Sequence, residues 1–245
     1  MDRARPAAYT VNPSAPHSDT PDEQAAAAVR FQQTLACAEK KRPEDRAPAL
    51  LDTLAILHTL PQAVMPVALR HIATIAQDLP EEHAVITTDV LLTHYPAMIA
   101  DYGQDTASHA AQSVAETLMH CAADRPQHYQ VQLLCKLAGV AAQSGVPLFA
   151  HFITGQLEAM LIQPHCSDPA ALIDAAAMLT QQQPVSQQLD ALKVLYRLAN
   201  EQKTHRLAAL EALQAQSGRL PLTLRTLDFL QTLTQEISRL RRGQI

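Results

Sequence analysis

The chain has few aromatic residues, few glycines and no tryptophan. Phe, Tyr and Trp together make up 4% of its 245 residues, whereas 47% are hydrophobic, so a core must be built mainly from Leu, Ala, Ile and Val. Leu and Ala favour helices, while sheets favour β-branched and aromatic side chains. The six glycines form no phosphate-cradling cluster, and no Asn-Gly or Asp-Gly pair indicates a tight hairpin. The composition therefore predicts an all-α protein.

The charge and hydrophobicity of the chain exclude several classes. Nineteen Lys and Arg against 24 Asp and Glu give a net charge of -5, which argues against a protein whose main task is to neutralise a nucleic-acid backbone. No apolar run has the ~18 residues needed to span a bilayer. Arg3 and Arg5 are not followed by the apolar block of a secretory signal. We expect a cytoplasmic protein, or one exported by a route that does not use such a signal.

Metal and cofactor motifs are also missing. The four cysteines form no Cys-x-x-Cys pair, and the eleven histidines form no His-Glu-x-x-His motif, so we expect packed, reduced thiols and no cofactor. One candidate metal set is Cys121, His128 and Cys135, because His128 and Cys135 share a helix face and Cys121 ends the preceding helix.

Cys166 is the candidate reactive thiol. It lies in the loop sequence QPHCSDP, directly before a predicted helix start, where the helix dipole lowers a thiol pKa. His165 is adjacent in sequence, but catalytic Cys-His pairs usually converge from separate segments. We therefore expect no nucleophilic catalysis at this loop.

Residues 1–22 are rich in Pro, Ser and Thr and contain few residues able to join a core. This composition predicts a disordered leader. A Ser/Thr/Pro-rich leader without a hydrophobic segment is also typical of substrates of bacterial type III secretion systems.

Residues 23–242 are predicted to form one helical domain of about eleven antiparallel helices, followed by a short tail at 243–245. Amphipathic stretches alternate with Pro, Gly or Asp breaks, and a break at 102–105 is a candidate internal boundary. Asp168 before Pro169 indicates a capped helix start, and Gly145 indicates a left-handed helix end. The predicted helices begin near residues 23, 44, 62, 81, 106, 126, 146, 168, 185, 204 and 221.

Alternate helix starts from 106 onward are separated by 40, 39 and 36 residues. HEAT and armadillo units repeat at ~40 to 47 residues and tetratricopeptide units at 34. The chain thus resembles helix-pair solenoids as an architecture, and a HEAT/armadillo-like α-solenoid is favoured over a compact helical bundle. No family motif is present, and the tetratricopeptide pattern is missing.

Two polar clusters remain. Arg239, Arg241 and Arg242 make the C-terminal end basic, which indicates compensation of a helix dipole or a contact for an acidic partner or phosphates. The Gln-rich run around Gln181–Gln183, Gln187 and Gln188 is interpreted as a solvated helix end and cap region.

A helical surface without a catalytic motif predicts a scaffold or adaptor that binds a protein partner through a groove. Two alternatives stay open. One is an enzyme whose site is dispersed over several helices, and the other is a nucleic-acid-binding protein that uses the basic C-terminal end. The sequence does not predict an oligomeric state.

Overall fold

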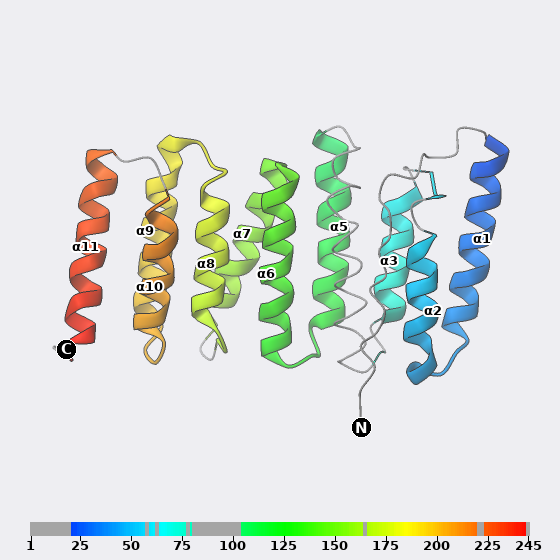
Figure 1. Cartoon of the computed structure of the whole chain (residues 1–245), viewed down its shortest axis with the longest axis horizontal. Coiled ribbons are helices and arrows are strands. Elements are labelled where there is room, and N and C mark those ends of the chain that lie inside the picture. The colour runs from blue at the N-terminus through cyan, green and yellow to red at the C-terminus, as the bar shows by residue number, and fades with distance from the viewer. Residues whose placement is uncertain are drawn as a thin grey trace, which may run out of the picture. The chain divides into compact units, whose positions relative to one another are not determined.

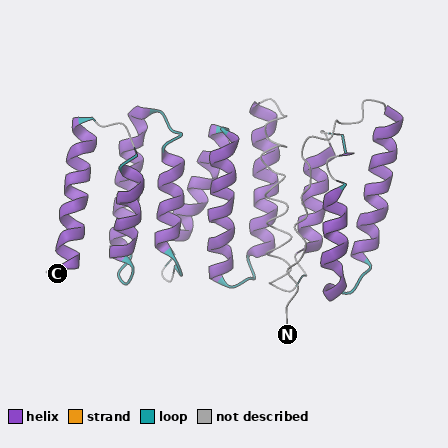
Figure 2. Ribbon diagram, viewed as in Figure 1, coloured by secondary structure: helices purple, strands orange, loops and turns teal. Residues whose placement is uncertain are grey.

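The computed structural model describes residues 21–56, 59–61, 64–76, 79, 104–163, 166–219 and 223–243. These residues form ten helices and no strand (Figure 2). The predicted all-α fold is thus confirmed for this part of the chain. No helix in it is both long enough and apolar enough to cross a membrane. The helix predicted to begin near Glu81 lies outside the described residues.

The chain divides into two compact units, Met1–Met98 and Ile99–Ile245. The first contains α1 (Pro21–Glu39), α2 (Pro43–Ala55) and α3 (Met65–Ala76), and α2 packs against both of the others. Because α1 begins at Pro21, the last two residues of the predicted leader belong to a helix, while residues 1–20 lie outside the described residues.

The second unit contains seven described helices in sequence (Figure 1). Each packs extensively only against the helices next to it and next but one along the chain. For example, α8 packs against α6, α7, α9 and α10. The bounds are α5 (Gln104–Ala122), α6 (Gln127–Ser144), α7 (Pro147–Leu161), α8 (Pro169–Thr180), α9 (Val185–Glu201), α10 (Arg206–Ser217) and α11 (Leu224–Arg241).

Local chemistry explains where these helices begin and end. Asp168 caps α8 by accepting a hydrogen bond from the backbone N–H of Ala171 at 3.0 Å, and a proline follows in the first turn, as predicted. Gly145 ends α6 with φ of 65°, a left-handed conformation that glycine adopts without the penalty of a Cβ. Thr223 begins α11 with a capping box to Thr226, which the sequence interpretation missed.

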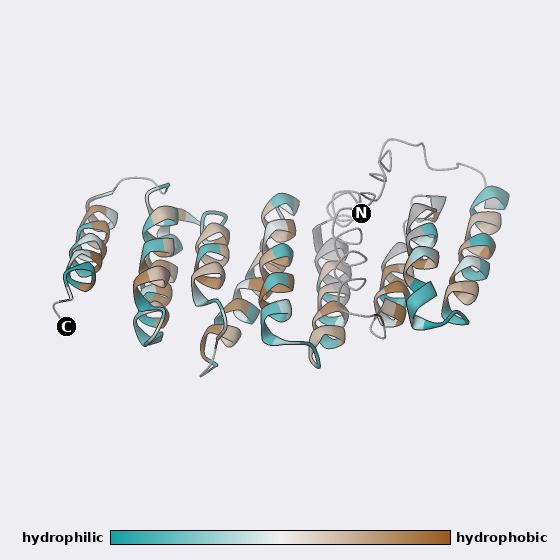
Figure 3. Ribbon diagram, turned by 60° about the horizontal axis from the view of Figure 1, so that its bottom comes forward, coloured by the Kyte–Doolittle hydropathy of each residue, from teal (hydrophilic) through white to brown (hydrophobic). Residues whose placement is uncertain are grey.

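The core of the second unit is aliphatic. Along α8, Leu172, Ile173, Ala176 and Leu179 are almost completely buried, and Phe149 of α7 is among the largest fully buried side chains. Helices such as α9 carry hydrophobic and hydrophilic residues on different sides (Figure 3), whereas α8 is almost wholly apolar and buried between its four neighbours. Burial of these apolar faces is the main stabilising contribution.

A side-chain hydrogen bond fixes the turn between α5 and α6. Gln130, the fourth residue of α6, donates its amide Nε2 to the backbone oxygens of Ala123 and Arg125, at 3.1 and 2.8 Å. These two carbonyls have no partner within a helix, because they follow the end of α5. We call this arrangement the turn latch.

The turn latch recurs at two other turns, each time from the fourth residue of the following helix to the carbonyls seven and five residues earlier. Gln188 of α9 reaches the turn after α8, and Arg46 of α2 reaches the turn after α1. The bonds are Gln188 Nε2 to Gln181 O at 3.3 Å and Gln183 O at 2.9 Å, and Arg46 Nη2 to Glu39 O at 3.3 Å and Lys41 O at 3.2 Å. One geometry therefore serves in both units, with two different residue types.

Glutamine side chains also join alternate helices of the second unit. Three of these hydrogen bonds join residues 40 to 42 positions apart in sequence, close to the predicted repeat spacing, and a fourth, from Gln181 to Gln216 at 3.2 Å, joins residues 35 positions apart. The bonds run from Gln182 to the backbone oxygen of Ala142, from Gln202 to that of Leu161 at 2.8 Å, and from Gln216 to the carboxylate of Asp174 at 2.7 Å. They connect α6 with α8, α7 with α9 and α8 with α10.

The interpretation of the Gln-rich run as a solvated helix end is therefore wrong for part of it. Gln188 is only 6% exposed, and the amide of Gln182 donates a hydrogen bond to the backbone oxygen of Ala142 in α6. Glutamine at these positions satisfies backbone carbonyls that would otherwise be buried without a donor.

Candidate functional site

A hollow that combines apolar walls with polar groups lies between the first turns of α7 and α9. It has a volume of about 220 Å³, and we call it the α7–α9 groove. The floor is formed by buried residues of α7 and α8, including Ala150 and Leu179. The rim carries Pro147, Leu148, His151, Gln182, Pro184 and Gln187.

The proline-initiated helix starts shape this groove. Pro147 occupies the first turn of α7 and Pro184 precedes the first residue of α9, and neither helix has a side-chain cap. The first turn of a helix leaves backbone N–H groups without intrahelical partners and carries a partial positive charge. The groove is thus bordered by two helix ends that favour hydrogen-bond acceptors such as a carbonyl or carboxylate.

Its apolar rim is open to solvent. Leu148 is 58% exposed, and Val185, which follows Pro184, is 59% exposed. Isolated exposed leucines are common on proteins, but a leucine on the wall of a hollow can bury its surface against an inserted side chain.

Gln182 also lines this hollow. Its amide nitrogen donates to the Ala142 carbonyl of α6, which fixes the orientation of the side chain. Its Oε1 is buried and, among the residues that the structure describes, has no hydrogen-bond donor. A buried acceptor without a donor costs free energy, and because this oxygen is covered by the chain it offers no contact to a group that enters the hollow.

A second hollow of about 130 Å³ lies between α5, α6 and α7. Its lining includes Met119 and Met160, whose flexible thioethers adapt to differently shaped apolar groups, together with Gln130 of the turn latch. It is smaller than the α7–α9 groove.

The candidate reactive thiol Cys166 is buried, so the expectation that it lies in an exposed turn is wrong. The side chain is 7% exposed, and burial raises the pKa of its thiol, although a hydrogen bond from the backbone of Asp168 acts in the opposite direction. The sequence correctly places Cys166 before the α8 start, but packing removes it from water. A neutral, buried thiol is a poor nucleophile.

The candidate metal set is not assembled. His128 is exposed, whereas Cys121 and Cys135 are partly buried. Among the described residues, no group of three or more His, Cys, Asp or Glu side chains is placed to hold a metal ion. Burial, together with the nearby carboxylates of Asp168 and Asp174 and the thiol of Cys166, raises the pKa of the Cys135 thiol to about 11.

The basic C-terminal residues have partners within the chain. Arg241 forms an ion pair with Glu211 of α10, with its Nη2 2.7 Å from the carboxylate. Arg239 lies 3.9 Å from Glu236, and the Nε of Arg242 donates to the backbone oxygen of Ser238 at 3.2 Å. The cluster is thus partly neutralised by carboxylates of α10 and α11.

Sequence reasoning did not find the α7–α9 groove. Its rim joins residues that are almost 40 positions apart, such as Leu148 and Pro184, and only the packing of α7 beside α9 brings them together. The one available signal was the pair of prolines, Pro147 and Pro184, at two helix starts one predicted repeat apart.

Comparisons of the chain with known protein families, with curated proteins and with solved structures find no match.

Proposed function

We propose that this chain is a protein-binding scaffold whose second unit holds a segment of a partner protein in the α7–α9 groove. The observation that carries the proposal is the exposed Leu148 on the wall of the hollow, beside the first turns of α7 and α9, neither of which has a side-chain cap. An apolar side chain of the partner would pack against Leu148, and a carbonyl or carboxylate beside it would lie at the positive ends of the two helices.

The proposal includes an open, HEAT/armadillo-like array for the second unit. Extensive contacts between helices that are adjacent or next but one support an open stack, because a closed bundle would also bring the first helix against the last. The starts of α5, α7, α9 and α11 at residues 104, 147, 185 and 224 give intervals of 43, 38 and 39 residues, which also fit repeated helix pairs.

A binding role fits the groove better than catalysis. The thiols of Cys135 and Cys166 and the carboxyl of Glu158 have raised pKa values because of burial, and none of the three lines the groove. Catalytic groups usually combine a perturbed pKa with access to a cleft. His151 is the titratable side chain of the rim.

Affinity capture with paired variants tests this function. We expect Leu148→Gln to weaken retention of the partner about tenfold to a hundredfold, since burying a leucine side chain contributes ~1.5 to 3 kcal/mol. Ile162→Gln, at the opposite end of α7 and 68% exposed, is the matched control and should retain the partner. Equal retention by both variants, or no retained protein, would contradict the proposal.

A narrower form of the proposal is that the chain is a substrate or accessory protein of a bacterial type III-like secretion system. It rests on the composition of residues 1–22. Deleting residues 1–20 should abolish export without changing thermal stability, and undiminished export of the shortened chain would refute it.

A further inference from the structure

The helix α11 is attached differently from the other helices of the second unit. It packs extensively against α10 alone, whereas α8 packs against four helices. Its fully buried apolar side chains are Leu233 and Ile237, at 0% and 3% exposure, and they lie four residues apart on one face. Phe229, four residues earlier, is half-buried and meets Tyr196 of α9 edge to face, with ring centroids 5.9 Å apart.

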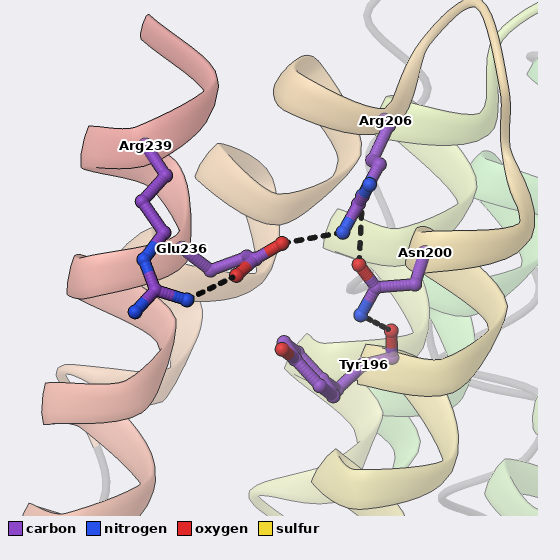
Figure 4. A network of polar contacts seen from close by, with 5 residues as sticks. All are labelled: Tyr196, Asn200, Arg206, Glu236 and Arg239. Atoms are coloured by element: carbon purple, nitrogen blue, oxygen red, sulfur yellow. Dashed lines mark hydrogen bonds and ion pairs between the residues drawn. The ribbon is translucent and has the colours of Figure 1, made fainter. Parts of the chain in front are cut away.

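Polar and charged contacts supply much of the remaining attachment. Glu236 of α11 forms an ion pair with Arg206, the first residue of α10, and Arg206 Nε also donates to Asn200 Oδ1 of α9 at 2.8 Å (Figure 4). In turn, Asn200 donates to the backbone oxygen of Tyr196 at 2.9 Å. The side chains of Arg206 and Glu236 are 28% and 19% exposed, so the pair is partly shielded from solvent.

Two more polar contacts lie along the same interface. Arg241 pairs with Glu211, and Gln214 Nε2 donates to Thr234 Oγ1 at 2.8 Å. Beneath α11, the surface of α9 and α10 therefore presents a cation at Arg206, an anion at Glu211, an apolar contact for Leu233 and Ile237, and the ring of Tyr196 for Phe229. It is complementary to a helix with the opposite pattern.

An interface held largely by polar and charged contacts separates at a lower free-energy cost than an interface of aliphatic side chains. When α11 leaves, the charged groups regain water, and only a short apolar stripe becomes exposed. The outward side of α11 is largely polar, with Asp228, Gln231 and Gln235 exposed. This side therefore faces water without penalty both when α11 is packed on α10 and when it is detached.

We propose that α11 is an exchangeable cover of the α9–α10 surface, and that an amphipathic helix of another protein, with apolar residues at positions i and i+4 and a carboxylate at i+3, binds there in its place. Leu233, Glu236 and Ile237 show this pattern in α11 itself. The surface is separate from the α7–α9 groove, so this inference stands or fails independently of the function proposed above.

Hydrogen exchange of the full chain gives the first test. Amides of α11 should exchange at least about tenfold faster than those of α8, and raising the salt from about 0.05 M to about 0.5 M should accelerate α11 and leave α8 unchanged. Equal protection of both helices, or no effect of salt on α11, would overturn the proposal.

A binding measurement gives the second test, with a fluorescent peptide of residues 223–243 as the probe. Glu236→Gln in the full chain weakens the resident helix, so the peptide, which keeps its own glutamate, should bind this variant about tenfold more tightly than the unchanged chain. Asp190→Asn, in an exposed pair with Lys193 on α9, is the matched control and should bind like the unchanged chain.

Companion measurements keep the result interpretable. A peptide with Glu236→Gln should bind the Glu236→Gln chain about tenfold more weakly than the unmodified peptide, because Arg206 then lacks a carboxylate. If the Glu236→Gln chain does not fold, Arg241→Gln, which removes only the exposed pair with Glu211, takes its place and should bind the peptide more tightly than the unchanged chain, by less than tenfold. Equal binding of the peptide to all chains would refute the proposal. Dimers in which two copies of the chain exchange α11 would also overturn it, because the helix bound on the α9–α10 surface would then come from a second copy and not from another protein.

Discussion

The turn latch at Gln130 makes a quantitative prediction about stability. Gln130→Ala removes two hydrogen bonds, to the backbone oxygens of Ala123 and Arg125. A neutral hydrogen bond contributes a net ~0.5 to 1.5 kcal/mol, so we expect a loss of about 1 to 3 kcal/mol in the free energy of unfolding. For a chain of this length, each kcal/mol corresponds to about 2 to 4 °C in Tm.

The matched control is Gln132→Ala. Gln132 lies on the same helix and is exposed, so both variants gain the same small helix propensity from alanine, and their difference isolates the latch. Thermal and urea unfolding followed by far-UV circular dichroism would measure that difference.

Two further substitutions sharpen the test. Gln130→Arg should be nearly neutral, because Arg46 forms the same latch with a guanidinium group in the first unit. Gln130→Glu should be worse than Gln130→Ala, because a carboxylate only accepts hydrogen bonds and would face two carbonyl oxygens. If Gln130→Ala matches Gln132→Ala, or if Gln130→Arg is as destabilising as Gln130→Ala, the latch does not stabilise the turn.

Other predictions concern caps, thiols and pH. Asp168→Ala should lower stability by ~1 kcal/mol by removing the α8 cap while Asp168→Asn retains it, as thermal unfolding would show, and equal losses would contradict the assignment. Iodoacetamide at about pH 8 should label exposed Cys37 before Cys135 and Cys166, and peptide mapping would give the order of labelling. The reason is that a pKa near 11 leaves only ~0.1% of the Cys135 thiol ionised at this pH. Fast labelling of Cys135 would refute this. Burial raises the pKa of the Glu158 carboxyl, so its ionisation lowers the stability of the fold as the pH rises from the unfolded pKa through the raised folded pKa. Glu158→Gln should therefore raise Tm at about pH 7 and change it little at about pH 3. A larger rise in Tm at about pH 3 than at about pH 7 would disprove the shift.

The helix positions could be read from the sequence because their determinants are local. Predicted starts near 126, 146, 168 and 185 lie within one residue of the observed starts, since a proline or a capping side chain marks each of them. The same reasoning failed for Cys166, because a loop cysteine before a helix looks exposed until the packing around it is known.

The glutamines show most directly what the sequence does not predict, namely which polar side chains are buried by packing. Gln182, Gln187 and Gln188 are the same residue type within seven positions, yet Gln187 is exposed while Gln188 is buried and holds a turn. Whether a glutamine is solvated depends on which carbonyls lie nearby, and for Gln182 that carbonyl belongs to a residue 40 positions away. Periodicity predicts that such pairs exist, but it does not identify them.

The restriction of extensive contacts to near neighbours also has a consequence for synthesis. In the second unit, the glutamine side-chain hydrogen bonds between alternate helices span 35 to 42 residues. At about 5 to 20 residues per second, a ribosome makes that length in about 2 to 8 seconds. We therefore expect each helix from α7 onward to meet its partners soon after it emerges, so that this unit folds progressively during translation and needs no contact between distant parts of the chain.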